Sequence, residues 1–416
     1  MLQRTHRLIQ WVFLGTLVGV AVGAASALFL WLLELATDYR TSHETIIFAL
    51  PLAGLIMGLM LHRWGGYVRR GNNLVIDTVH DSKERIPLSV APWVLGGTVI
   101  THLFGGSGGR EGAAVQMGAA LADEISRRIH VQPHTRTQLL AAGIAGGFGA
   151  VFGTPIAGAV FGLEVVHLGK LEYSALVPAL VASVVGDFTV RALGIHHSLL
   201  PKVDVLPIDP VLAVKWTFVG VLVAMVAIAF IEMTHGIKSL LEMRVRSLPL
   251  RMAFAGLAVV ALWQLVGSSD YLGLGSPTIM SAFNEPSVWY AFALKVVFTA
   301  ITLGAGFLGG EVTPLFFIGA TLGSALAGPL GLPLALTAGV CMAAMFAAAS
   351  NTPLALSIMA VELLGANALP HVVIVCVVAY LMTGSRSIYP SQRLLCEKGS
   401  ASLLAVPTSL HELRRG

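Results

Sequence analysis

A glycine-rich stretch, GSGGREGAAVQMG at residues 106–118, places an arginine and a glutamate side by side. An apolar segment of about one membrane-crossing length, residues 86–109, leads directly into it. An ionisable side chain in such surroundings is costly and is a functional candidate by default. The carboxyl group of Glu111 is neutral when protonated and can swing away, whereas the ionised group can occupy an anion site and compete with the anion. The alternative is an ion pair between Glu111 and the adjacent Arg110.

The composition is that of a membrane protein. Of the 416 residues, 56% are hydrophobic and 12% are charged, whereas roughly a quarter of a soluble domain is charged. Runs without Asp, Glu, Lys or Arg cover residues 11–33, 137–163 and 312–361, and the run at 252–269 is nearly as long as a span. These runs are continuous rather than alternating, which excludes the pattern of a membrane β-barrel. We expect an all-α polytopic membrane protein.

The N-terminal stretch MLQRTHRLIQWVFLGTLVGVAVGAASA has the features of a signal peptide, with basic residues, an apolar run and small residues near Ala25. The apolar run continues through LFLWLL, which favours a first membrane helix instead. Cys341, Cys376 and Cys396 are too few for a disulfide framework and lack metal-ligand spacing, so they are interpreted as packing residues. We expect no metal site and no cofactor.

Basic residues gather in four places: Arg4 and Arg7, residues 63–85, residues 238–251, and Arg414 and Arg415. Short basic loops stay on the cytoplasmic side of a membrane. The pattern therefore predicts a multi-pass protein of the plasma (inner) membrane, with both termini in the cytoplasm. The basic clusters flank apolar runs and lack interleaved aromatic residues, so the lipid bilayer, and not nucleic acid, is the expected surrounding.

The two halves of the chain resemble each other. TPIAGAVFGLE at 154–164 and TPLALSIMAVE at 352–362 are offset by 198 residues (352 − 154), and GREGAAVQMGAAL from Gly109 and GEVTPLFFIGATL from Gly310 by 201 (310 − 109). Two stretches at nearly one offset indicate an internal duplication, although small apolar residues also match by chance. We expect one repeat over residues 1–205 and a second over 206–416, with no appended soluble domain.

With both termini on one side, two such repeats suit an inverted topology, in which broken helices meet near the membrane midplane. GGSGGREG, GFLGGEVTP and GPLGLP interrupt the apolar runs and are the expected breaks. A helix N-terminus carries unpaired N–H groups and the positive end of the helix dipole. Two such ends that face each other form an anion site without a full positive charge.

These stretches resemble the CLC family of anion channels and anion/proton antiporters. GSGGREG is similar to the family's GREGP signature, with Ala113 in place of the final proline, and GGEVTP matches its GxFxP segment. GNNLVID at 71–77 lies at its GSGIP segment, and SIYPSQ supplies the tyrosine expected near the end, Tyr389. The resemblance spans roughly residues 10–395 and implies a CLC-type fold of two inverted-topology repeats with broken helices.

Three departures from the family pattern resemble its fluoride-exporting branch. The serine of GSGIP is Asn72, the GxFxP segment gains Glu311 and Thr313, and the inner proton-transfer glutamate expected just after Glu164 is Val165. The resemblance implies proton transfer or gating by Glu111 and Glu311. The residues it implies for anion binding are Asn72, Gly108, Gly109, Arg110, Gly112, Val312, Thr313 and Tyr389.

Several of these residues have simpler interpretations. Asn72 is also suited to a turn or a helix cap, Glu311 to the first turn of a helix, and Tyr389 to a membrane interface. His102 is interpreted as a packing residue. Glu164 and Glu362 end matching helices, and their symmetry favours a structural part in which they accept backbone N–H groups.

The leading hypothesis is a proton-coupled fluoride exporter, whose partners are the fluoride ion and protons. Fluoride enters cells as neutral HF and ionises inside, and proton entry would drive its expulsion. A chloride or nitrate antiporter, or a passive anion channel, is the alternative within the same fold. A third hypothesis is an intramembrane serine protease, because GGSG at 105–108 fits a GxSG pattern with Ser107 as nucleophile. The family resemblance also implies a homodimer.

Overall fold

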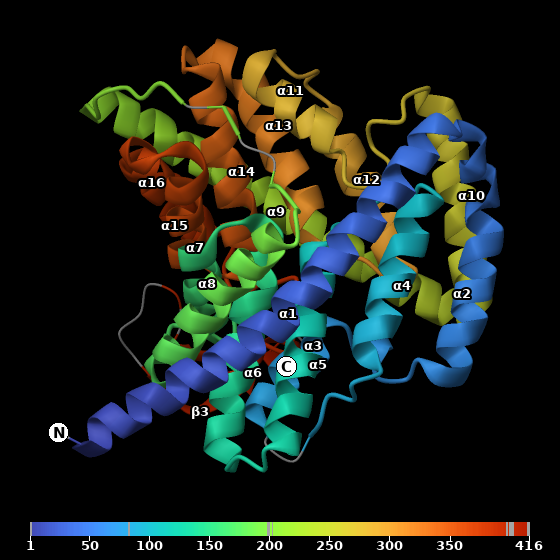
Figure 1. Ribbon diagram of the computed structural model, residues 1–416. Coiled ribbons are helices and arrows are strands. Elements are labelled where there is room, and N and C mark those ends of the chain that lie inside the picture. The colour runs from blue at the N-terminus through green and yellow to red at the C-terminus, as the bar shows by residue number, and fades with distance from the viewer. Residues whose placement is uncertain are drawn as a thin grey trace.

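The computed structural model is mainly helical and divides into two successive sets of helices (Figure 1). It describes residues 2–81, 84–197, 200–201, 203–396, 398 and 403–413, so Arg414 and Arg415 of the C-terminal basic cluster lie outside the described residues. The first set comprises α1 (Leu2–Ser42), α2 (Leu50–Trp64), α3 (Asn72–His80), α4 (Val90–Leu103), α5 (Glu111–Arg128), α6 (Pro133–Phe152), α7 (Pro155–Glu164) and α8 (Leu176–Ala192).

The second set of helices follows α8 along the chain. It comprises α9 (Pro210–Arg244), α10 (Leu248–Val266), α11 (Ser276–Asn284), α12 (Ala291–Gly304), α13 (Val312–Leu330), α14 (Leu334–Ser350), α15 (Pro353–Leu364) and α16 (Leu369–Met382). The prediction of a polytopic helical fold is confirmed. The predicted boundary between repeats at residue 205 falls in the segment between α8 and α9 and stays a prediction.

Glycine, proline and asparagine divide the long apolar runs, at the predicted break GPLGLP and at two further places that were not predicted, Gly153 and Asn351. The run at 137–163 divides at Gly153, which adopts a left-handed conformation with φ 71°, and α7 then begins at Pro155. The run at 312–361 becomes α13, α14 and α15, with left-handed residues at Gly331 and Asn351. Within the described residues, six helical segments are long and apolar enough to cross a membrane, and others are shorter apolar helices. Several apolar helices are therefore shorter than a full membrane span.

Glycine allows matching helices to pack closely in both halves. A Cβ atom added to Gly118 of α5 would lie 2.2 Å from the carbonyl oxygen of Gly143 in α6. A Cβ atom added to Gly319 of α13 would lie 2.4 Å from the carbonyl oxygen of Cys341 in α14. No side chain fits at such distances, so glycine is required where these backbones touch. Cys341 and Cys376 are buried free thiols, in keeping with their interpretation as packing residues.

The two halves cap each other's helices. The Glu164 carboxylate at the end of α7 accepts hydrogen bonds from the backbone N–H groups of Leu354 and Ala355, at 3.1 and 2.8 Å, in the first turn of α15. Glu362 of α15 accepts the equivalent bonds from the first turn of α7, at 3.0 and 2.8 Å. Each carboxylate thus satisfies orphan donors at a helix N-terminus of the other half. The structural interpretation of both glutamates is confirmed.

A small sheet was not part of the all-α expectation. Strand β1 (His167–Leu168) pairs in parallel with β2 (Arg393–Cys396), which pairs antiparallel with β3 (Leu403–Ser409) before the short helix α17 (Leu410–Leu413). The sheet joins the segment after α7 to the segment after α16. It thereby fixes the region of Tyr389 against the first half.

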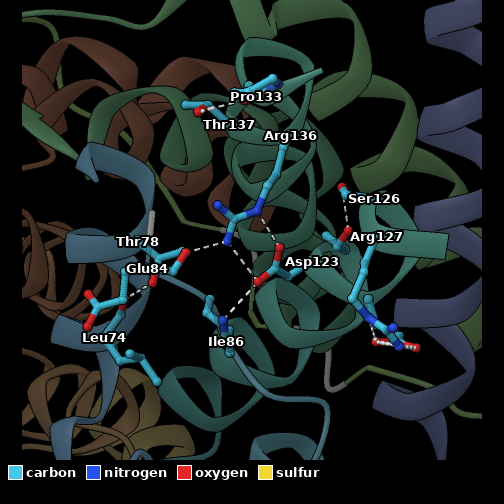
Figure 2. Close-up of polar contacts among 12 residues, drawn as sticks. Leu74, Thr78, Glu84, Ile86, Asp123, Ser126, Arg127, Pro133, Arg136 and Thr137 are labelled. Carbon is cyan, nitrogen blue, oxygen red and sulfur yellow. Dashed lines mark hydrogen bonds and ion pairs between the residues drawn. The ribbon is translucent and has the colours of Figure 1, made fainter. Parts of the chain in front are cut away.

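A polar network holds the segment between α3 and α4 against α5 and α6 (Figure 2). Asp123 accepts a hydrogen bond from the backbone of Ile86 at 2.8 Å and from Arg136 Nε at 2.5 Å. Arg136 also donates to the Glu84 carbonyl oxygen at 2.7 Å. The Glu84 side chain forms an ion pair with Arg70, which also contacts Asp77 of α3. One connected network thus links α3 to the C-terminal part of α5 and to the start of α6.

The exchanged caps predict a measurable loss of stability. Glu164→Ala leaves two N–H groups of α15 without their acceptor, which is expected to cost about 1–3 kcal/mol. Glu164→Gln keeps one acceptor oxygen and is expected to lose less. Thermal unfolding of the purified protein in detergent measures the difference.

The matched control is Glu285→Ala, because that side chain is exposed at the end of α11. Equal melting temperatures for Glu164→Ala and Glu285→Ala would contradict the capping role.

Candidate functional site

Two of the predicted breaks meet at the centre of the molecule. Gly109 and Gly310 form an isolated antiparallel bridge, with N–O distances of 2.6 and 2.7 Å in its two hydrogen bonds. Gly109 precedes α5 and Gly310 precedes α13, so the bridge brings together the N-terminal ends of two helices from different halves. The bridge pairs residues that are 201 positions apart, which is the offset of the sequence repeat.

The Glu111 carboxylate lies at this junction and is 1% exposed. It accepts hydrogen bonds from the Thr313 hydroxyl, at 2.6 and 2.7 Å to its two oxygens, and from the Thr313 backbone N–H at 3.1 Å. The backbone N–H of Arg110 adds a bond at 3.1 Å. A buried charge needs such donors to offset its lost hydration. A carboxylate thus occupies a position with donors from both halves.

The adjacent Arg110 is not the main partner of Glu111. Its Nε atom lies 3.5 Å from the Glu111 carboxylate and forms no hydrogen bond with the described residues. Arg110 contributes only its backbone N–H to the Glu111 carboxylate, whereas Thr313, in the opposite half of the chain, donates from both its backbone and its side chain. These contacts favour the interpretation of Glu111 as a group held between two helix ends over the alternative of an ion pair between Glu111 and Arg110.

Asn72 is the first residue of α3 and lies against the start of α5. A Cβ atom added to Gly112 would lie 2.9 Å from Asn72 Nδ2. The Asn72 side chain makes no capping hydrogen bond, and its Oδ1 is buried without a partner in the described structure. The interpretation of Asn72 as a helix cap is therefore wrong.

Glu311 lines a cavity that Glu111 does not line. It precedes α13 without a side-chain capping bond, and its Oε2 is buried without a partner among the described residues. It lines a cavity of about 440 Å³ together with Asn72, Gln116, Lys238 and Tyr389. Neither Glu111 nor Thr313 lines that cavity. One carboxylate is thus enclosed by donors, and the other faces the cavity.

Tyr389 is 4% exposed, which does not fit an interfacial aromatic residue. Its backbone N–H donates to the Ser387 hydroxyl at 2.9 Å, and Asn73 Oδ1 accepts from the backbone of Ser391 at 3.0 Å. The second asparagine of GNN therefore anchors the tyrosine segment. Sequence reasoning missed this role of Asn73, for which the doubled asparagine was the only signal.

Gln392 is a second residue that sequence reasoning missed. Its amide donates to the carbonyl oxygens of Val165 at 2.7 Å and Ser350 at 2.8 Å, and its Oε1 accepts from Ser387 at 2.6 Å. Val165 itself is buried and apolar. The position where the family pattern places an inner glutamate is therefore closed by packing and by backbone hydrogen bonds.

Ser107 does not have the geometry of a protease nucleophile. Its hydroxyl lies 2.9 Å from that of Thr299, and its backbone N–H donates to Thr302. The His102 ring nitrogens face the carbonyl oxygens of Thr98 and Gly108, at 2.8 and 3.0 Å. No Ser–His pair forms here within the described residues, and His102 instead holds the glycine-rich segment, in keeping with a packing role.

Comparison with known proteins identifies the architecture. The model of the voltage gated chloride channel family matches residues 53–384. The chain belongs to this family, the CLC family. The CLC family comprises ion transporters and channels of the membrane, so the chain is a membrane-embedded ion transport protein.

Individual relatives share most of their length with the chain. A chloride/fluoride channel protein of Pseudomonas syringae pv. tomato is 44% identical, over 92% of this chain and 86% of the relative. A crystal structure of a CLC-type fluoride/proton antiporter superposes with a TM-score of 0.90 and 36% identity, covering 93% of this chain and 98% of that one. A slow cyanobacterial Cl⁻/H⁺ antiporter shares the fold, at a TM-score of 0.80, 17% identity and coverage of 90% and 94% of the two chains.

The close approach of Asn72 to Gly112 can be tested by substitution of the glycine. Gly112→Ala would place a Cβ atom 2.9 Å from Asn72 Nδ2 and 3.1 Å from Gly310 Cα, so the amide or the bridge must move. We expect anion transport by reconstituted protein to fall by about 10-fold or more, because small misplacements at a site are costly. Gly96→Ala is the control, since an added Cβ there meets no atom within 4 Å. Equal transport by the two variants would show that this contact is not needed.

Proposed function

We propose that this protein is a fluoride/proton antiporter that exports fluoride from the cytoplasm, driven by proton entry. The observation that carries the proposal is the Glu111 carboxylate held by Thr313 from the opposite half. An anionic group already occupies a position built from strong donors. A small anion that accepts hydrogen bonds strongly can replace it when the carboxyl group is protonated.

Fluoride is small and tightly hydrated, and it is a stronger hydrogen-bond acceptor than chloride. A site that removes its water must supply strong donors in return, or the cost of desolvation dominates. The Thr313 hydroxyl and the Asn72 amide supply such donors. The N-terminal ends of α5 and α13 add backbone N–H groups near Gly108, Gly112 and Val312, whereas the N–H of Gly109 already donates to Gly310.

Proton coupling follows from the different surroundings of the two carboxyl groups. The enclosed Glu111 gives up its position only after it gains a proton, because the ionised group keeps the Thr313 donors. Glu311 faces the cavity that also contains Asn72 and Tyr389, so it can exchange protons with that side. Only one negative group fits among the donors at a time, which links anion movement to proton movement.

Chloride transport within the same fold is the second candidate, because the name of the Pseudomonas relative includes chloride. The replacement of the family serine by Asn72, and the closed position of Val165, argue for fluoride. A passive anion channel would need no second carboxyl group at a cavity.

We also propose the accompanying features of the family. Each subunit of a homodimer has its own pathway, both termini lie in the cytoplasm, and the protein resides in the plasma (inner) membrane. Residues 1–205 and 206–416 form the two inverted repeats.

Substitution of the two carboxyl groups tests the coupling. In liposomes, Glu111→Gln is expected to move fluoride without protons, since an amide does not take up a proton or compete as an anion. Glu311→Gln is expected to lower proton uptake per fluoride by a factor of about 10². Parallel fluoride and pH electrodes measure both fluxes.

Glu285→Gln is the control for these two variants, because it removes an exposed carboxyl group outside the site. Proton uptake by Glu111→Gln at the wild-type ratio to fluoride would refute the coupling mechanism.

Substitution of Thr313 tests the preference for fluoride. Thr313→Val keeps the shape of the side chain but removes the hydroxyl donor, and one hydrogen bond to a charged group is worth about 1.5–3 kcal/mol. We expect the ratio of fluoride to chloride transport to fall by about 10-fold or more, whereas Thr313→Ser should retain it. An unchanged ratio in Thr313→Val would mean that the hydroxyl does not determine the anion.

A further inference from the structure

A second polar cavity lies between the start of α1 and the turn that joins α5 to α6, away from the central site. Its volume is about 590 Å³. Its lining includes Arg7, Trp11, Gln132, His134, Thr135 and Gln138. These lining residues include basic and amide side chains but no aspartate or glutamate.

The basic groups at this end of the molecule are not equivalent. Arg136 pairs with Asp123, as Figure 2 shows, and Arg127 and Arg128 pair with Glu124. Arg7 lines the cavity, is exposed, and is in none of the ion pairs formed within the described part of the chain. The cavity therefore contains a cation whose charge the protein does not neutralise locally.

The start of α6 adds hydrogen-bond donors to the same cavity. The helix begins at Pro133, and the side chain of Gln132 makes no capping hydrogen bond to it. The N–H groups of His134 and Thr135 belong to the first turn, which has no intrahelical acceptors. Such a helix end, beside an arginine, suits the oxygens of a phosphate group.

Gln138 supplies a hydrogen-bond acceptor, which a phosphate without a donor group does not use. Its side chain is 8% exposed, and its amide donates to the Ser174 carbonyl oxygen at 3.1 Å. Its Oε1 is buried without a partner among the described residues. A buried unpaired acceptor favours a ligand that also carries a donor. The cavity thus offers donors for an anion and, on the next turn of α6, an acceptor.

The neighbouring surface favours a lipid over a soluble phosphate. Trp11 lines the cavity, and tryptophan is enriched at membrane–water interfaces. On the adjoining part of α1, Leu8, Ile9 and Phe13 are 51%, 62% and 66% exposed. Figure 1 shows this end of α1 extending beyond the other helices, so its sides are open to acyl chains.

We propose that this cavity binds the headgroup of an anionic phospholipid that carries a free hydroxyl group, such as phosphatidylglycerol. Arg7 and the start of α6 bind the phosphate, and the headgroup hydroxyl donates to Gln138 Oε1. The acyl chains lie along the exposed apolar side of α1. The lipid thereby joins the first helix to the α5–α6 turn, and its binding is independent of which anion the protein transports.

Native mass spectrometry of the full-length protein, titrated with single lipids, tests the site. The wild type is expected to bind phosphatidylglycerol about 10-fold more tightly than phosphatidylcholine. Both lipids carry the phosphate that Arg7 would contact, but the choline group adds a positive charge beside the arginine and has no hydroxyl to donate to Gln138. It should also prefer phosphatidylglycerol to phosphatidylmethanol, which has the same phosphate diester but no hydroxyl. Equal affinity for phosphatidylglycerol and phosphatidylcholine would overturn the proposal, as would equal binding of inorganic phosphate.

Two variants and a control locate the site. Arg7→Gln is expected to weaken phosphatidylglycerol binding by about 10-fold, whereas Arg4→Gln, the same change on a residue outside the cavity lining, should not. Gln138→Met should abolish the preference over phosphatidylmethanol. Equal loss in Arg4→Gln and Arg7→Gln would indicate general attraction to basic residues and would overturn the site. If a variant fails to fold, the wild-type comparison of the lipids decides the question.

Discussion

The hydrogen bonds between Thr313 and the Glu111 carboxylate are the interaction on which the site depends. They cross from one half of the chain to the other, beside a backbone bridge that joins the two helix ends. Neither half can supply this arrangement alone, because α5 provides the carboxylate and α13 provides its donors. The internal duplication therefore has a direct physical consequence at the centre of the molecule.

The surrounding structure holds these two helix ends in place. Glycine permits backbone contact between α5 and α6 and between α13 and α14, while Glu164 and Glu362 exchange caps between the halves. The network around Asp123 and Arg136 positions α3 relative to α5. Rigid supports of this kind keep donors aimed at one place without reorganisation, which is what tight binding of a strongly hydrated anion requires.

The sequence predicted the parts of this arrangement that follow a local pattern. Charge-free runs predicted a polytopic helical protein, and the glycine-rich breaks and the repeat offset predicted that helix ends of the two halves meet. The structure adds that the two glycines at the offset of 201, Gly109 and Gly310, form a backbone bridge. At that offset Glu311 corresponds to Arg110 rather than to Glu111. The two carboxylates are therefore not symmetry equivalents, which agrees with their different surroundings.

Other features had no local signal. Gln392 reaches Val165 across 227 positions, and Asn73 reaches Ser391 across 318, through hydrogen bonds between a side chain and the backbone. Such contacts leave no periodicity or spacing in either segment. The small sheet was also missed, because two of its strands are short and its pairing depends on segments far apart in the chain.

Fluoride affinity as a function of pH tests the central claim most directly, with calorimetry on the purified wild type and on Glu111→Gln. If the carboxylate and the anion compete for the same donors, wild-type affinity is lower at a pH where the Glu111 carboxyl group is ionised than at a pH where it is protonated. The affinity of Glu111→Gln should then be higher at alkaline pH and nearly constant. Wild-type affinity that does not change with pH, or an equal pH dependence in both proteins, would contradict the account.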